Sequence, residues 1–464
     1  MKKIQKFVMA FLLGAMTLGF TACGSDNGGD EEFNLPEVGQ ATTSVSSQDK
    51  EMQKVAKNYV QAVVYPTYQA LAANARTLYS AAQTLYKSAE AGTMTQDEIN
   101  AACEAFKNTR REWERSEAFL FGSATDNELD PHIDSWPLDR DELEKALKNE
   151  TLIAGFKSEN PAKFVSEHNT KFQSVLGFHG MEFVLFRNGA HRTVEALKAN
   201  DTDEGVTSVR GIDELAFLQA VAADVRNITA LLEFTWMGSA ASNETKAILS
   251  GEGSYVFSTL RYNGLASNGT MCFGQNLLSP SSTTGYTSWQ GTMNQIFVGG
   301  CSNICAEVAD QKLGQAYRVA TGHGGTTEDG EKESIDYIES PYSHRSFIDY
   351  QDNIYSIKNS LYGTRDINAT TPAENSMLSL LKKMNYSGYD KLVNALNTAI
   401  QTLETAKNSG KSFVEEPGAQ RVKDCIDAVS ALDEELNNAG SWINLQTLSN
   451  KSILTTWRRV KNRS

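Results

Sequence analysis

The sequence predicts an all-α protein with two helical-bundle-like halves and a glycine-rich irregular insertion in the middle. Long stretches without glycine carry apolar residues at helical spacing, and several of them begin and end with helix-capping residues. The composition also changes near residue 250, where Gly, Ser, Thr and Asn become frequent. We therefore expect a signal peptide at 1–22, a lipidated flexible tether at 23–46, an N-terminal helical half at 47–245 and a C-terminal helical half at 246–464.

The N-terminus predicts export and a lipid anchor. Three of the first six residues are lysines, and the apolar stretch at 7–20 is shorter than the ~20 residues that cross a bilayer as a helix. It ends in Phe20-Thr21-Ala22-Cys23, which resembles the bacterial lipobox, whose cysteine is acylated and becomes the mature N-terminus. The resemblance implies an outer-membrane lipoprotein, held through lipid on Cys23 at the periplasmic face or the cell surface. Ordinary secretion with cleavage near Ala22 is the alternative.

Charge and cysteine content restrict the partners. The chain has 43 basic and 57 acidic residues and a formal charge of −14, so it should repel nucleic acid. No segment after the leader reads as a membrane span, so the mature body should be soluble. Besides Cys23 there are five cysteines, and an odd number leaves at least one free thiol. Cys301 and Cys305 lie four apart on an expected helix, where we expect buried thiols rather than a disulfide.

The helices of the N-terminal half have local boundary signals. The stretch 47–91 lacks glycine, and Pro66 should kink or divide it. Thr95 and Glu98 form a capping box for a helix that we expect to run to Phe121 and stop at Gly122. Further helices are expected at 139–149, at 161–187 with a break at Gly177, and at 212–237, the last one amphipathic and ending at Gly238.

The second half begins with the irregular insertion. Residues 250–288 should lack regular structure apart from a small hairpin near 255–257. The halves contain similar helix stops, Phe121-Gly122 and Tyr362-Gly363, which leaves an internal duplication open. Helices are expected near 292, over most of 301–320, and at 342–362, 373–384, 390–407 and 419–438.

The stretch Gly177-Phe178-His179-Gly180-Met181-Glu182 carries the strongest chemical signal. On a helix, His179 and Glu182 share a face within otherwise apolar surroundings. A carboxylate buried there must be paired, protonated or bound to a metal. His with Glu is a competent ligand pair for zinc or iron. The spacing also fits a structural His–Glu hydrogen bond where helices pack. Taken alone, the spacing favours this hydrogen bond over a metal site.

This stretch resembles the GxHxxE motif of the imelysin-like family, which includes peptidase-named and iron-regulated outer-membrane proteins. Three other segments resemble the family's signatures in the same order: 113–122, 134–137 and 343–354. The resemblance implies an all-helical fold with the motif near the interface of its two halves. Many relatives carry a cysteine in the second-half segment, whereas Ser346-Phe347-Ile348-Asp349 has none here, so the ligand can differ.

The resemblance implies a metal site for iron or zinc with His179 and Glu182 as ligands and Glu117 and Asp349 as additional ones. Taken without it, Arg110 and Glu114 form an ordinary i,i+4 pair that is typical of a solvent-exposed helix face. The other residues expected to line the site are Arg110, Glu114, Asp134, Trp136, Ser343, Ser346, Asp352 and Asn353.

Three functions remain open at this stage. The first is binding of a metal or a metal-bearing ligand for uptake, with an outer-membrane transporter as a partner. The second is a zinc metallopeptidase, although the HExxH pattern would need Glu and His where Gly180 and Phe183 stand. The third is peptide or glycan binding through the aromatic-rich segment 255–289. The sequence leaves enzymatic activity uncertain.

Overall fold

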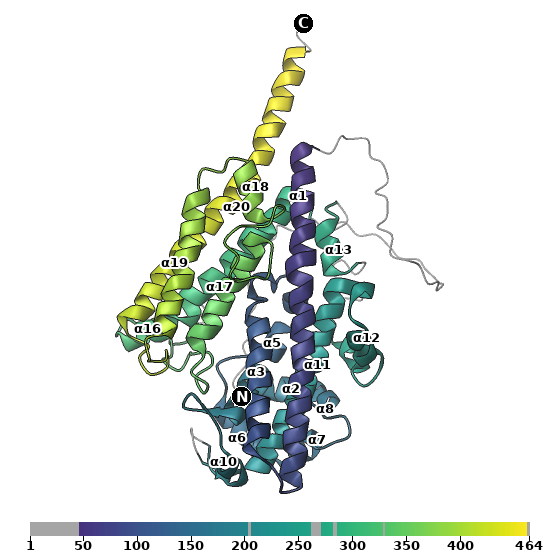
Figure 1. Ribbon diagram of the computed structural model, residues 1–464, viewed down its shortest axis with the longest axis vertical. Coiled ribbons are helices and arrows are strands. Elements are labelled where there is room, and N and C mark those ends of the chain that lie inside the picture. The colour runs from purple at the N-terminus through teal and green to yellow at the C-terminus, as the bar shows by residue number, and fades with distance from the viewer. Residues whose placement is uncertain (1–45, 203–205, 261–270, 282–284, 328–329, 462–464) are drawn as a thin grey trace. The chain divides into compact units, whose positions relative to one another are not determined.

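The computed structural model describes residues 46–202, 206–260, 271–281, 285–327 and 330–461. The predicted signal peptide, Cys23 and nearly all of the tether lie outside these residues. The described chain is mostly helical, which confirms the predicted fold class (Figure 1). The division into halves at 245 and 246 stays a prediction.

The first long helix is continuous, and Pro66 does not divide it (Figure 1). It comprises α1 (Ser47–Asn58), a π-helical segment η1 (Tyr59–Val64) and α2 (Tyr65–Glu90). Pro66 lies in the first turn of α2, directly after the π-helical segment, where the Tyr65 amide donates to Val60 O. The wider turn changes the hydrogen-bond pattern just before the proline, whose missing N–H is best tolerated at such a position.

Helix α3 (Gln96–Glu114) begins with the predicted capping box but ends before the predicted Phe121. A short 3-10 turn, η2 (Glu117–Phe119), follows, and Gly122 then adopts a φ of 93°. The Ala118 amide donates to Ser356 Oγ of α17 (Ser346–Tyr362) at 3.0 Å. A tertiary hydrogen bond thus replaces a helical one, which the local sequence does not reveal.

Helix α11 (Gly211–Met237) is enclosed by its neighbours, so the prediction of an amphipathic helix is wrong. It packs against α2, α8 (Pro161–Phe172) and α9 (Gly177–Leu185). By length and composition it could cross a membrane, contrary to the sequence-based expectation, but its apolar window is completely buried inside the protein. Its polar side chains find partners on other segments; Glu214, for example, accepts a hydrogen bond at 2.6 Å from Arg192, which follows α9 in the chain.

The predicted helices at 139–149 and 161–187 are present, the second divided at Gly177 between α8 and α9, whereas the short helices at 123–126, 130–133, 150–156, 194–198 and 243–250 were not predicted. Two short antiparallel hairpins were not predicted; in the first, Phe186 lies opposite His191. The remaining elements are α4 (Ser123–Asp126), α5 (Asp130–Ile133), α6 (Arg140–Lys148), α7 (Glu150–Phe156), η3 (Gln173–Val175), β1 (Phe186–Arg187), β2 (Ala190–His191), α10 (Val194–Lys198), β3 (Asn200–Asp201), β4 (Val209–Arg210), η4 (Gly238–Ala240) and α12 (Asn243–Ser250).

In the insertion, a 3-10 segment, η5 (Ser254–Thr259), replaces the expected hairpin. The five described cysteines are free and buried, which confirms the expectation for Cys301 and Cys305 and that of at least one free thiol. Helix α17 begins four residues after the predicted start, Tyr342, and the last helix continues well beyond Asn438. The other elements are α13 (Phe273–Leu278), α14 (Trp289–Asn294), η6 (Gln295–Ser302), α15 (Asn303–Ala306), η7 (Glu307–Lys312), α16 (Gly314–Ala320), α18 (Met377–Lys383), α19 (Tyr389–Lys407) and α20 (Gln420–Lys461).

Candidate metal centre

Two glycines let α9 approach its neighbours closely. Gly177 has a φ of 69°, and a Cβ on it would lie 1.9 Å from Ile133 O at the end of α5. A Cβ on Gly180 would lie 2.1 Å from Val175 O. Any larger residue would push α9 away, because real Cβ atoms never come this close to an oxygen. The contact with Ile133 places the next residue, Asp134, beside His179.

His179 lies between two carboxylates. Its Nε2 is 3.0 Å from Asp134 Oδ1, and its Nδ1 is 3.8 Å from Glu182 Oε2. Burial disfavours the charged imidazole, but the interactions with Asp134 and Glu182 prevail and raise the pKa of His179 to about 9. The other oxygen of Glu182 accepts hydrogen bonds from the Ser343 amide at 2.8 Å and from Ser343 Oγ at 2.6 Å. Both motif residues are thus buried and face residues distant in sequence, as their apolar flanks predict.

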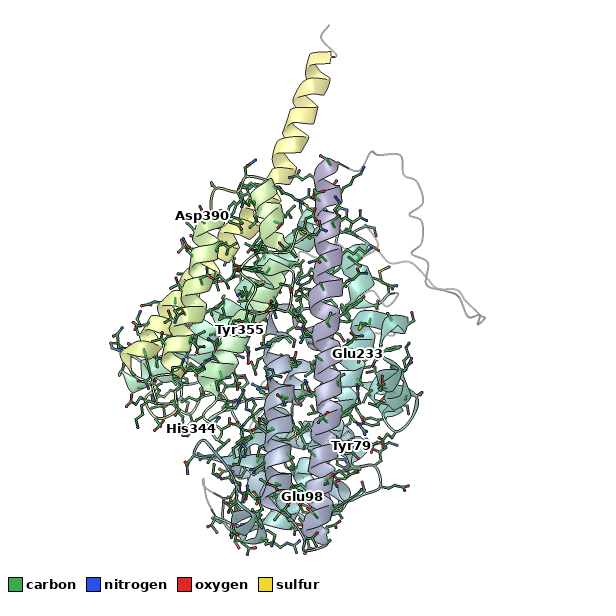
Figure 2. All side chains as sticks on the ribbon, viewed as in Figure 1. Tyr79, Glu98, Glu233, His344, Tyr355 and Asp390 are labelled. Carbon is green, nitrogen blue, oxygen red and sulfur yellow. The ribbon has the colours of Figure 1, made fainter. Side chains whose placement is uncertain are left out.

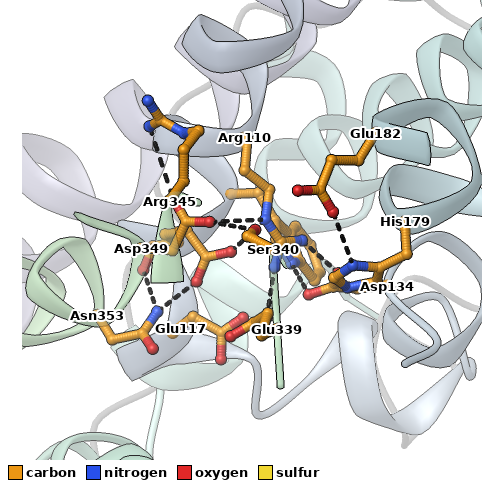
Figure 3. Close-up of polar contacts among 12 residues, drawn as sticks. Arg110, Glu117, Asp134, His179, Glu182, Glu339, Ser340, Arg345, Asp349 and Asn353 are labelled. Atoms are coloured by element: carbon orange, nitrogen blue, oxygen red, sulfur yellow. Dashed lines mark hydrogen bonds and ion pairs between the residues drawn. The ribbon is translucent and has the colours of Figure 1, made fainter. Parts of the chain in front are cut away.

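Arg110 lies among several buried carboxylates. The prediction that Arg110 and Glu114 form a solvent-exposed pair is therefore wrong. Both Arg110 and Glu114 are fully buried, with Arg110 Nε 2.5 Å from Glu114 Oε1. The guanidinium also forms ion pairs with Asp134 and Glu339 and lies 3.9 Å from Asp349 Oδ2 (Figure 3). Four carboxylates therefore surround one cation, and they come from four different segments of the chain.

Asp134, His179 and Glu339 form a group that could hold a metal ion. One ligand atom from each residue lies within 4.8 Å of the others, and all three side chains are buried. Metal–ligand bonds of about 2.0–2.2 Å put neighbouring ligands roughly 3 Å apart, which matches the 3.0 Å between His179 and Asp134. Buried polar atoms without a hydrogen-bond partner among the described residues cluster here: Glu114 Oε1, His179 Nε2, Glu182 Oε2, Glu339 Oε2, Asp349 Oδ1 and Asn353 Oδ1.

The centre holds more carboxyl groups than positive charges. The buried acids are Glu114, Glu117, Asp134, Glu182, Glu339 and Asp349, whereas the buried bases are Arg110, Lys312 and His179. Burial raises the pKa values of Glu114 and Glu117 well above the usual carboxyl range, although Arg110 and Lys312, respectively, oppose the rise. Burial likewise raises the pKa of Asp349 to about 6. The excess acids must therefore keep protons or gain a cation.

The structure does not place Glu117 and Asp349, the predicted additional ligands, in contact with His179 or Glu182. Glu117 Oε2 lies 4.0 Å from Lys312 Nζ, and Asp349 accepts a hydrogen bond from Ser340. Of the predicted lining residues, Asp134 and Ser343 contact the motif directly. The others lie around it: Ser346 Oγ donates to Glu339 O, Asn353 Nδ2 donates to Glu114, Asp352 pairs with Arg115, and Trp136 packs against Tyr337 with ring centroids 4.1 Å apart.

Sequence reasoning missed Glu339, Ser340 and Lys312. Glu339 and Ser340 precede Ser343 in a loop, and no periodicity or spacing marks them as ligands. Lys312, whose Nζ is 3.2 Å from Glu339 Oε2, ends a π-helical segment and resembles any other helical lysine in the sequence. Only the fold brings these residues to Arg110.

The fold and these contacts together define an all-helical protein with a buried, acid-rich cluster that could hold a metal ion. The sequence profile of the imelysin family, which carries a peptidase name, matches residues 64–436. The chain belongs to the imelysin family.

Its relatives include iron-regulated proteins. Iron-regulated protein A of Synechococcus elongatus is 36% identical over 130 residues, which cover 28% of this chain and only 30% of that relative. A crystal structure of a candidate iron-regulated protein A precursor from Parabacteroides distasonis has a TM-score of 0.63 and 23% identity over 86% of this chain and 96% of its own. An imelysin-like protein from Psychrobacter arcticum has a TM-score of 0.51 and 12% identity over 85% and 95%. These two structures support the fold alone.

Proposed function

We propose that this protein is a lipoprotein of the bacterial cell envelope that binds iron, or a ligand that carries it, for uptake. Its binding centre is the group of Asp134, His179 and Glu339, supported by Glu182. One observation carries the proposal: three buried side chains of the types that bind iron and zinc each place a donor atom within 4.8 Å of the other two.

The surrounding charges support a cation at this position. Several oxygen atoms of the buried acids have no hydrogen-bond partner among the described residues, and the acids outnumber the bases. These oxygens lie within 3.8 Å of Arg110, Lys312, Arg345 or His179, but the acids in excess of these bases are still uncompensated. Burial of uncompensated carboxylates is costly, and a bound cation would remove that cost without the need for protonation. A neutral imidazole is also required for ligation, so metal binding should release the proton of His179.

Arg110 is a built-in competitor for the same carboxylates. Its guanidinium pairs with Asp134 and Glu339, two of the three proposed ligands. Glu114 and Asp349 can hold Arg110 when those two carboxylates turn toward a metal. The competition should weaken binding, which suits a protein that must release its cargo to a transporter.

Iron is favoured over zinc by the names of the relatives. The partly matching relative and the structural relative are both described as iron-regulated protein A. The donor set of one imidazole and several carboxylates accommodates iron well. No described observation favours a peptidase, because no second imidazole joins the three-residue group within the described part of the chain.

The test is metal retention by the mature chain purified without a histidine tag. The protein is loaded with iron(II) under anaerobic conditions, desalted and measured by elemental analysis. We expect wild type to retain about one iron per chain and His179→Ala to retain almost none. His323→Ala is the matched control, because His323 is exposed and outside the centre, and it should behave as wild type.

Two results would contradict the proposal. Wild type that retains no iron, zinc or other transition metal after loading would leave the buried group without a cargo. Equal retention by wild type and His179→Ala, with loss in His323→Ala, would place the metal elsewhere.

A further inference from the structure

A group of basic side chains lies where α3 meets the start of α17. Lys107 and Arg111 share one face of α3, and Arg115 follows at the same four-residue spacing at the C-cap of the helix. His344 and Arg345 immediately precede α17. We call these five residues the basic patch. Figure 2 labels His344 and Tyr355, and the Tyr355 ring centroid lies 5.7 Å from the Arg115 guanidinium. Such a concentration of bases is unusual in a chain with a formal charge of −14.

Lys107, Arg115 and Arg345 each have an acidic partner within the protein, whereas Arg111 has only a distant one that it shares with another arginine. Lys107 Nζ lies 2.8 Å from Glu104, and Arg115 Nε lies 2.8 Å from Asp352. The Arg111 side chain is 40% exposed, and its Nε lies 3.9 Å from Glu112 Oε1. Glu112 is already engaged through its other oxygen, which pairs with Arg365. Arg111 therefore presents its charge to solvent.

Arg345 links the patch to the buried centre. Its Nη2 lies 3.5 Å from Asp349 Oδ1, and Asp349 Oδ2 lies 3.9 Å from Arg110 (Figure 3). The Arg345 side chain is 13% exposed, and its buried Nε has no hydrogen-bond partner among the residues that the structure describes. The buried Nε is out of reach of a ligand in solvent, so a ligand would meet the partly exposed end of the guanidinium, which lies at the edge of the centre.

Three arginines of the patch, Arg111, Arg115 and Arg345, act on the same carboxyl group, that of Asp352, so they are close neighbours. Burial raises the pKa of Asp352, and the positive charges of Arg115, Arg345 and Arg111 all oppose that rise. The N-terminus of α17 adds to the positive potential, because Arg345 occupies its N-cap position and no side chain caps its first amides.

We propose that the basic patch binds the carboxylates of an anionic metal chelate, with Arg111 and Arg345 as the main contacts. This inference rests on the proposed function and names the form in which the metal arrives. A free metal cation is repelled by the patch, although the acidic centre behind Arg345 attracts it. A polycarboxylate complex of a metal suits both the basic patch and the acidic centre. Its carboxylates pair with the guanidinium groups, and its metal is brought next to the acids.

Calorimetric titration of the mature full chain tests the proposal with three probes: citrate, its iron(III) complex and inorganic phosphate. Arg111→Gln and Arg345→Gln should each weaken binding of the iron–citrate complex about fivefold, and the double variant should bind more weakly than either single variant. Arg140→Gln, an exposed arginine on α6, is the matched control and should bind as wild type. Binding should also weaken as salt is raised. Because Arg111 is exposed, its variant should fold even if loss of Arg345 disturbs Asp349.

The outcomes separate this inference from the proposed function. Citrate binding that Arg111→Gln weakens and His179→Ala leaves unchanged supports the patch, even if no metal is retained and the proposed function fails. Retention of free iron(II) with no binding of citrate or its complex overturns the patch and leaves the proposed function standing. Phosphate binding as tight as that of the complex, or equal affinity in Arg111→Gln and wild type, also overturns the polycarboxylate assignment.

Discussion

Replacement of Gly177 by alanine tests the close approach that builds the centre. At a φ of 69°, alanine is in the left-handed region, which costs a residue with a Cβ about 1–2 kcal/mol. The new Cβ would also lie 1.9 Å from Ile133 O and 2.3 Å from Ile133 C, so the backbone of α5 must move. Such overpacking costs about 1–3 kcal/mol. The free energy of unfolding should therefore fall by about 2–5 kcal/mol in Gly177→Ala.

Gly92→Ala separates the two contributions. Gly92 has a φ of 73°, close to that of Gly177, but no atom lies within 4 Å of a Cβ placed there. This variant should lose only the backbone term of about 1–2 kcal/mol, and the entropy that alanine removes from the unfolded chain is common to both variants. The difference between the variants is the steric term.

The assay is urea unfolding of metal-free protein followed by circular dichroism at pH 7. Iron retention of the folded Gly177→Ala protein is measured as well, because a displaced α5 moves Asp134 away from His179. Insoluble Gly177→Ala beside soluble Gly92→Ala would also fit the reasoning. If Gly177→Ala loses no more stability than Gly92→Ala, α9 does not approach α5 as closely as described, and our explanation of the glycine in the motif is wrong.

Three further predictions concern pH, catalysis and anchoring. His179 has a folded-state pKa of about 9, above the ~6.5 of an unfolded histidine, so its contribution to stability is complete below pH 6.5 and is lost as pH rises to 9. Thermal unfolding of metal-free wild type should show this loss relative to His179→Gln, and parallel profiles of the two proteins across that window would contradict it. Zinc-loaded protein should leave casein and unfolded insulin chains intact; chelator-sensitive cleavage that vanishes in Glu182→Gln would instead establish a peptidase. A fatty-acid probe should label wild type in growing cells and spare Cys23→Ala, and equal labelling of both would refute the lipid anchor.

The sequence predicted those features of the fold that depend on neighbouring residues. The capping box at Thr95 and the break at Gly177 are local devices, and both occur where expected. The end of α3 and the enclosure of α11 were predicted wrongly because they depend on distant residues. In α11, for example, Asp224 lies 2.5 Å from His132, a residue 92 positions earlier in the chain. Asp224 is buried because it has this partner, whereas a charged residue in a helix is expected from sequence alone to face solvent.

The residues of the candidate centre likewise fall into those that the sequence could predict and those that it could not. His179 and Glu182 could be found because they are three residues apart on one helix. Glu339 could not, because its partner Arg110 is 229 residues away and its own loop carries no regular pattern. The expected exposure of Arg110 and Glu114 was wrong for the same reason: four-residue spacing is common to surface pairs and to buried ones, and only tertiary structure distinguishes them.

The hydrogen bonds from Ser343 to Glu182 join segments 161 residues apart, and this has a consequence for the order of events in folding. A zinc finger collects its ligands from a short stretch, so its metal can guide folding. In the proposed site, the ligands converge only after the loop before α17 has docked on α9, so the site forms late in folding. The chain would therefore become able to hold a metal only as a finished fold, and a metal could not guide the folding of an early segment.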